Sequence, residues 1–160
     1  MGQGSNDGRP GDLGSAVDWA SAAMEQGFDG LSRLSSNAED VSAARTRYDD
    51  LRTDLAPVVR GADRIELVMA ADRIERSGRQ DQALVIVTES MVIVSGVHRG
   101  FMGIRTVMDI FPRSVLTVLP PTDRQRHAVE LHADGRRLRL LLPNAMLQAA
   151  LIALSGRDAR

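Results

Sequence analysis

The stretch ALVIVTESMVIVS, from Ala83 to Ser95, decides the fold of this chain. Two runs of β-branched and aliphatic residues flank the polar pair Glu89-Ser90, and so short a break fits only a hairpin turn. Each run is apolar at nearly every position, so we expect both faces of the hairpin to be covered. The stretch therefore predicts the central hairpin of an antiparallel β domain.

A second hairpin lies further along the chain, around Asp134-Gly135, a favoured two-residue type I′ turn. This turn fixes the register of its two strands. It places Leu131 opposite Leu138, Val129 opposite Leu140, and Glu130 opposite Arg139. The alternation predicts one apolar face and one charged face.

The segments around these hairpins predict further strands. Residues 62–76 fit both the strand period and the helix period, and we interpret them as a short helical turn followed by a strand near Ala70–Arg76. Three glycines in Gly96–Arg105 predict a mobile loop, and residues 122–127 a polar one. Thr106–Phe111 and Val115–Leu119 are expected to form strands on either side of a turn at residues 112–114.

Helices are expected at both ends of the β domain. At the C-terminal end, Pro143-Asn144 starts a helix that ends at Gly156, with the apolar stripe Met146, Leu147, Ala150, Leu151 and Leu154. At the N-terminal end, an amphipathic helix starts at Ser15 and is broken or loosened by Gly27 and Gly30. Residues 1–14 have almost nothing to bury and are expected to form a disordered tail.

A second N-terminal helix, Ala38–Ala56, begins after the cap Asn37 and is followed by Pro57. Its apolar residues recur at heptad spacing: Val41, Ala44, Tyr48, Leu51 and Leu55. The stripe packs either on the rest of this chain or on another copy or another protein. Two heptads are too few to identify a coiled coil.

Composition excludes several classes of function. The 160 residues contain no cysteine and no lysine, which excludes thiol catalysis, Cys-ligated zinc and Schiff-base chemistry. The exclusive use of arginine is typical of a high-GC bacterium. The net charge is −1, far from a nucleic-acid footprint. With no secretory signal and no apolar run of membrane-spanning length, we expect a cytoplasmic protein.

The order of these elements resembles the bacterial pleckstrin-homology-like (PH-like) domains, related in fold to PH and GRAM domains, over about residues 62–154. The resemblance rests on ALVIVTESMVIVSG, on DIFPRSVLTV, and on the ending HADGRRLRLLLPNAMLQAAL. It implies an α+β fold: a PH-like antiparallel β-barrel or sandwich of about seven strands, capped by a C-terminal helix. We divide the chain into a tail (1–14), a helical appendage (15–60), a PH-like domain (62–156) and a second tail (157–160).

The resemblance also implies a basic rim. In PH domains the open end of the barrel binds phosphoinositide headgroups, and arginine suits phosphate. The corresponding loops of this chain carry Arg73, Arg76, Arg79, His98, Arg99 and Arg105. Glu75 and Asp81 in the same region oppose an anion site. The loops are therefore a solvated surface, a protein-contact rim or an anion site.

No catalytic constellation is visible. The three histidines, His98, His127 and His132, have no metal-ligand spacing and no carboxylate partner in an obvious dyad. The arginines from Arg124 to Arg139 lack interleaved aromatic residues, which argues against nucleic-acid binding. We expect a non-enzymatic interaction or scaffold protein without cofactor or metal, which binds a protein partner, including its own copies. Peripheral binding of anionic lipid headgroups by the barrel rim is the alternative.

Overall fold

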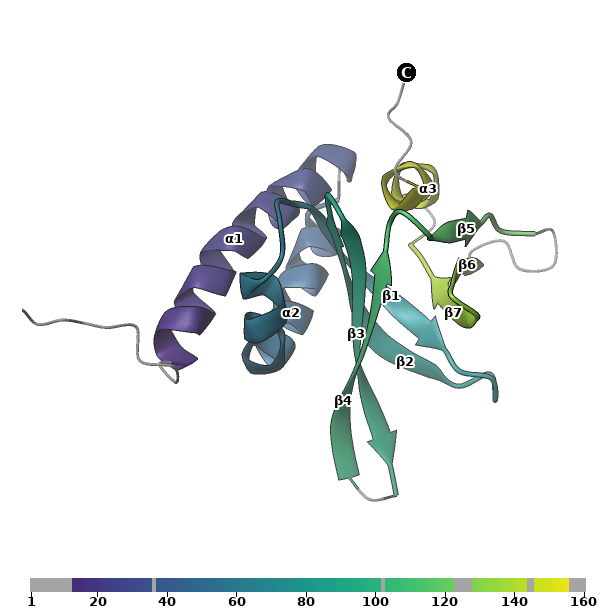
Figure 1. The fold of residues 1–160 in the computed structure, drawn as a ribbon, viewed down its shortest axis with the longest axis horizontal. Helices are drawn as coiled ribbons and strands as arrows, with labels where there is room; N and C mark the ends of the chain where they lie inside the picture. Colours follow the sequence, from purple (N-terminus) through teal and green to yellow (C-terminus); the bar gives the residue numbers. More distant parts are fainter. Residues whose placement is uncertain (1–12, 36, 102, 123–127, 144–145, 156–160) are drawn as a thin grey trace, which may run out of the picture.

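The computed structural model describes residues 13–35, 37–101, 103–122, 128–143 and 146–155. Two long helices precede the strands and a short helix follows them (Figure 1). The elements are α1 (Leu13–Leu34), α2 (Ala38–Arg60), β1 (Ile65–Ile74), β2 (Gln80–Thr88), β3 (Met91–Gly100), β4 (Gly103–Pro112), β5 (Thr117–Leu119), β6 (Ala128–Ala133), β7 (Arg136–Leu141) and α3 (Leu147–Ser155).

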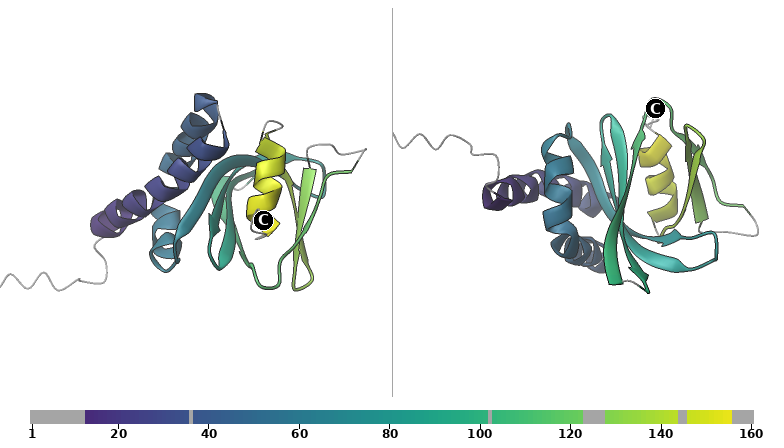
Figure 2. Two further views of the ribbon diagram at one scale, coloured as in Figure 1. Left: turned by 90° about the horizontal axis from the view of Figure 1, so that it is seen from above. Right: turned by 60° about the horizontal axis from the view of Figure 1, so that its bottom comes forward.

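The seven strands form one antiparallel sheet in the order β4-β3-β2-β1-β7-β6-β5. The described strands β4 and β5 stand at opposite ends of this order, so the sheet is curved but not closed. Helix α3 lies between the β1–β4 strands and the β5–β7 strands, as the left view of Figure 2 shows. The predicted α+β class is confirmed, with a sandwich-like arrangement in place of a closed barrel.

Both predicted hairpins are confirmed. In the first, Val85 pairs with Val94 and Ile86 with Ile93, and all four side chains are fully buried. In the second, the predicted pairs Leu131 with Leu138, Val129 with Leu140, and Glu130 with Arg139 all occur. The turn residues Asp134 and Gly135 have φ values of 50° and 78°, as a type I′ turn requires.

Helix α1 is continuous through Gly27 and Gly30, so the predicted break there is wrong. The glycines instead let the helix lie directly on β1. A Cβ atom on Gly27 would stand 2.3 Å from Val68 Cγ2, and one on Gly30 would stand 2.0 Å from the carbonyl oxygen of Glu66. Residues with a side chain would hold the helix away from the strand.

Helix α2 begins at the predicted cap, where the Asn37 side chain accepts a hydrogen bond from the Glu39 N–H. It continues past Pro57 to Arg60, further than predicted. Its Arg47 donates to the carbonyl oxygens of Ala71 on β1 and Ala83 on β2, the latter at 2.9 Å. The helical region, the sheet and α3 share one continuous apolar core.

The strand predicted at Val115–Leu119 is shorter in the structure, where β5 is Thr117–Leu119. Two further segments of the sheet differ from the sequence-based expectations in type. Residues 65–74 form a single strand, β1, without the predicted helical turn. The glycine-rich segment Gly96–Arg105, predicted as a mobile loop, belongs to the paired strands β3 and β4, whose register runs from Met91–Pro112 to Gly100–Gly103. In both places the ladder of backbone hydrogen bonds decides the conformation. Residues 1–12 of the predicted N-terminal tail, the cap at Asn144, the stop at Gly156 and most of the polar loop 122–127 lie outside the described residues. The last two residues of the predicted tail, 13 and 14, begin α1.

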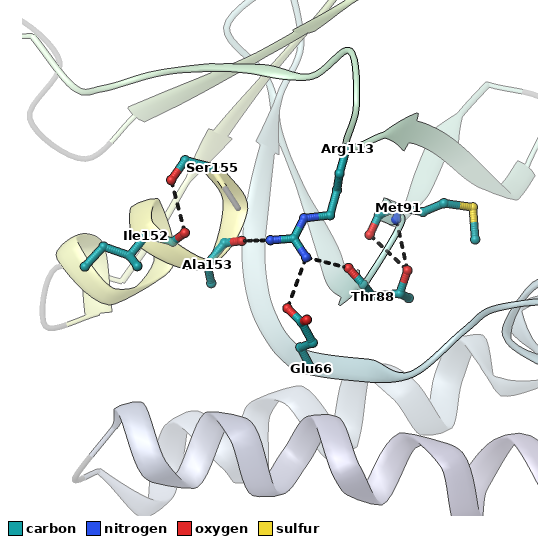
Figure 3. Close-up of polar contacts among 7 residues, drawn as sticks. All are labelled: Glu66, Thr88, Met91, Arg113, Ile152, Ala153 and Ser155. Atoms are coloured by element: carbon teal, nitrogen blue, oxygen red, sulfur yellow. Dashed lines mark hydrogen bonds and ion pairs between the residues drawn. The ribbon is translucent and has the colours of Figure 1, made fainter. Parts of the chain in front are cut away.

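Helix α3 covers the inner face of the sheet with Ala150 and Leu154, which are buried, as is Met146 just before the helix, while Leu151 is only partly buried. Arg113 holds the end of this helix in place (Figure 3). Its guanidinium donates to the carbonyl oxygens of Thr88 at 2.8 Å and Ala153 at 2.7 Å, and lies 3.1 Å from Glu66 Oε2. Arg113 therefore satisfies a helix-terminal carbonyl and joins α3 to β1 and β2.

Candidate interaction surface

Two of the six predicted rim residues are held in ion pairs. Arg73 Nη1 on β1 lies 2.8 Å from Asp109 Oδ2 on β4, and Arg73 is 17% exposed. Arg79 Nε lies 3.0 Å from Asp81 Oδ1, whose side chain is 9% exposed. Because the carboxylates balance these two guanidinium groups, neither presents an uncompensated positive charge to an anion.

Of the other four predicted rim residues, two are exposed and two have side chains outside the described part of the structure. Arg76, in the β1–β2 turn, and Arg105, on β4, are exposed. His98 and Arg99 lie on β3, opposite Arg105 and Ile104, but their side chains are outside the described part of the structure. The structure thus brings Arg73 to an acidic partner, Asp109, while the arrangement of the six residues as one anion site stays a prediction.

The apolar stripe of α2 is covered by this chain itself. Ala44, Tyr48, Leu51 and Leu55 are at most 3% exposed, and Val41 packs against the same core. The Tyr48 ring meets the Phe28 ring of α1 edge to face, at a centroid distance of 6.0 Å. Burial raises the pKa of the Tyr48 hydroxyl. A partner helix would have to displace α1 or the sheet to reach this stripe.

Strand β4 leaves one edge unpaired among the described strands. Gly100 and Gly103 flank the two-residue turn of the β3–β4 hairpin, so the odd-numbered residues of β4 exchange backbone hydrogen bonds with β3. The even-numbered residues Ile104, Thr106, Met108 and Ile110 therefore direct their N–H and C=O groups outward. The outward carbonyl of Ile110 accepts a hydrogen bond from Arg136 Nη2 at 2.7 Å, in agreement with this assignment.

Among the residues whose exposure is described, the most exposed large apolar side chains lie on the β3–β4 hairpin. Phe101 at its turn is fully exposed, and Ile104 is 70% exposed. The hairpin projects beyond the rest of the sheet (Figure 1). At the other end of β4, Arg136 stacks over the Phe111 ring, with Cζ 4.8 Å from the centroid. Arg136 thus closes that end. Between Ile104 and Met108 no described strand pairs with the edge, and the Thr106 hydroxyl donates to Asp54 Oδ2 of α2 at 2.7 Å.

A cleft of about 260 Å³ lies between α1, α2, β1 and the segment that follows β7. Its charged lining residues are Asp40, Arg47 and Asp72. Arg47 already bonds the sheet carbonyls and pairs with Asp72 at 3.4 Å, so this cleft is a structural junction. Within the described ranges, no group of three or more histidine or acidic side chains could hold a metal ion, and no helix could span a membrane.

The β4 edge and Arg113 were not among the residues singled out from the sequence. Arg113 contacts residues 66, 88 and 153, which are remote in the chain. The unpaired edge depends on the position of β4 at the end of the sheet order. The alternation of Ile104, Thr106, Met108 and Ile110 was the one available signal, because it marks a strand with an apolar face.

Comparison with known proteins finds similarity in structure only. No family model and no curated protein sequence matches the chain. One similar structure is the C-terminal domain of an unknown protein from Leishmania infantum, with a TM-score of 0.50 and 10% identity over 68% of this chain and 98% of that one. Another contains the DH/PH domains of a mutant RhoGEF, with a TM-score of 0.48 and 9% identity over 84% of this chain and 43% of that one. At such identities the first similarity concerns the fold alone.

Proposed function

We propose that this chain is a non-enzymatic interaction module that binds a protein partner through the outer edge of β4. The observation that carries the proposal is the edge from Ile104 to Met108, with which no described strand pairs, beside the exposed side chain of Ile104. An unpaired strand edge offers a row of backbone donors and acceptors to an extended segment of another protein. Alternate side chains of β4 would supply the apolar contacts.

The other surfaces considered from the sequence are less suitable. The stripe of α2 is buried in the chain's own core, and Arg73 and Arg79 are paired with acids. The seven antiparallel strands followed by a helix agree with the PH-like resemblance, and the interaction role is carried over from that resemblance by analogy of fold. The resemblance therefore supports an interaction role without selecting a partner.

Met108→Pro tests the proposal. The N–H of Met108 faces the free edge, so proline removes a donor from the proposed contact without breaking the β3–β4 ladder. Met108→Ala is the matched control, because it removes the same side chain and keeps the N–H. We expect the proline variant to lose a partner captured from cells of the source organism by the wild type, and the alanine variant to retain it.

Thermal melts of both variants show whether each is folded. Equal capture by a folded proline variant would refute strand addition at β4. Anionic headgroup binding is the competing function. Among the predicted rim residues whose side chains are described, Arg76 and Arg105 are exposed and not assigned to an ion pair above. If the wild type floats together with anionic vesicles but an Arg76→Glu, Arg105→Glu double variant does not, binding of anionic headgroups replaces the proposed function.

A further inference from the structure

We propose that the protein partner of β4 is a second copy of this chain, whose β4 strand pairs antiparallel with the first about a two-fold axis at Val107. This inference rests on the proposed function and adds the identity of the partner and the register. It begins from the unpaired edge, where Thr106 and Met108 direct their backbone groups outward. A two-fold dimer is the simplest closed assembly such an edge allows.

The side chains of β4 are complementary to themselves in this register. The strand reads Ile-Arg-Thr-Val-Met-Asp-Ile from Ile104 to Ile110. When a second copy runs antiparallel about Val107, Arg105 faces Asp109 of the second copy. Thr106 then faces Met108, and Ile104 faces Ile110. Opposite charges and apolar pairs placed directly across two strands stabilise a sheet.

The charges select this register over its neighbours. Outward-facing residues must pair with each other, so the axis can move only by whole residues along β4. With the axis at Thr106, Arg105 faces Val107 and Asp109 faces Gly103. With the axis at Met108, Asp109 faces Val107 and Arg105 faces Phe111. Only the axis at Val107 sets the arginine against the carboxylate.

The surroundings of β4 include α2, whose Asp54 Oδ2 accepts a hydrogen bond from the Thr106 hydroxyl at 2.7 Å. This contact uses the side chain of Thr106 and not its outward backbone groups. Arg105 is exposed. The Asp109 carboxylate contacts Arg73 through Oδ2 and is 23% exposed. Since a carboxylate can accept bonds from two partners, Arg105 of the second copy can approach without displacing Arg73. Arg136 already binds the carbonyl of Ile110, so the new backbone bonds concentrate on Thr106 and Met108. The exposed side chain of Ile104 becomes covered.

A single engineered cysteine tests the register, because the natural chain has no cysteine. In Val107→Cys the two thiols face each other across a non-hydrogen-bonded pair, where Cα atoms stand about 4.5 Å apart. Disulfides form at Cα separations of about 4.4–6.8 Å. We expect Val107→Cys to form a covalent dimer in oxidised glutathione. In Ile104→Cys the thiol is more exposed but faces Ile110 of the second copy and not a second thiol. This variant should therefore run as a monomer in non-reducing denaturing electrophoresis.

Sedimentation velocity of the wild type over a wide concentration range provides the non-covalent test. We expect a concentration-dependent dimer, which Arg105→Glu abolishes by placing two carboxylates opposite each other. The control variant Arg76→Glu makes the same charge change away from β4 and should keep the dimer.

Three results would overturn this proposal: a wild type that is monomeric throughout, a cross-link in Ile104→Cys equal to that in Val107→Cys, or dimers unaffected by Arg105→Glu. The proposed function fails separately. If the wild type is monomeric while Met108→Pro still loses a captured protein that Met108→Ala retains, β4 binds a different protein. If both tests are negative, the edge is not an interaction site.

Discussion

Gly30→Ala should destabilise the protein, although glycine is normally a poor helix residue. In an isolated helix the change to alanine gains about 1 kcal/mol. Here the new Cβ would stand 2.0 Å from the Glu66 carbonyl oxygen, and contacts under 3.0 Å are essentially never found. The neighbour is strand backbone rather than a flexible side chain, so α1 and β1 must separate by about 1 Å or more.

The magnitude follows from these opposing effects. Overpacking of this kind costs about 1–3 kcal/mol, and the separation also loosens the contacts of Met24, Phe28 and Leu31, the buried residues of α1. After the helix-propensity gain, we expect a net loss of about 1–2 kcal/mol. In a chain of this length that lowers the melting temperature by roughly 2–8 °C.

Gly61→Ala is the matched control for this measurement. Gly61 has a right-handed helical conformation, and a Cβ there would have no neighbour closer than 3.8 Å. Its melting temperature and urea midpoint should stay near those of the wild type. If Gly30→Ala equals or exceeds the wild type in both measurements, α1 does not lie on β1 as described.

Three further predictions concern other parts of the core. The double variant Leu51→Glu, Leu55→Glu should lower the free energy of unfolding by at least roughly 3–6 kcal/mol, because both side chains are buried, and the whole chain should be unfolded in a circular-dichroism melt. A folded double variant would show that the stripe of α2 is not part of the core. Arg113→Lys keeps the charge but loses the planar fork that joins Thr88, Glu66 and Ala153, and should lower stability by about 1–2 kcal/mol in urea titrations, whereas Arg76→Lys should not. Hydrogen bonds from Thr88 and Ser90 lower the pKa of Asp63, so the Asp63 carboxylate contributes fully to stability above the unfolded-state pKa of about 3.9, and this contribution is lost as pH falls through the folded-state pKa. The difference in urea midpoint between wild type and Asp63→Asn should therefore shrink below about pH 4. A difference independent of pH would contradict this.

The sequence was sufficient wherever local chemistry determines the structure. The Asp134-Gly135 turn sets the register of β6 and β7, because few residues other than glycine tolerate the required positive φ. Asn37 marks the start of α2 because its side chain can accept a hydrogen bond from the Glu39 N–H in the first turn. The hairpin of β2 and β3 was predicted from two buried apolar runs separated by a polar pair.

The remaining errors concern residues whose conformation depends on remote partners. Gly30 predicts a helix break from the sequence alone, because its role is visible only once the carbonyl oxygen of Glu66 is seen to lie against it. Segment 65–74 fits both the strand period and the helix period because β1 is covered by helices on one face and by the inner core on the other, so apolar residues occupy both faces. Among the site residues, Arg73 was identified as a rim cation, but its carboxylate partner, Asp109, comes from a strand 36 positions further along.

The pairing of β1 with β7 determines how this chain can assemble. Helices α1 and α2 and the hairpins of β1 to β4 join segments that are neighbours in the sequence, whereas Asp72 must find Leu141. Closing this loop carries an entropic cost before any contact repays it, and non-local pairing of this kind forms slowly. On a ribosome, the N-terminal two thirds of the chain emerge and can pack while β7 and α3 are still being made. The inner apolar face of β1 to β4 is then open to solvent until the last segment arrives, which makes that interval the one in which the chain is most exposed to aggregation.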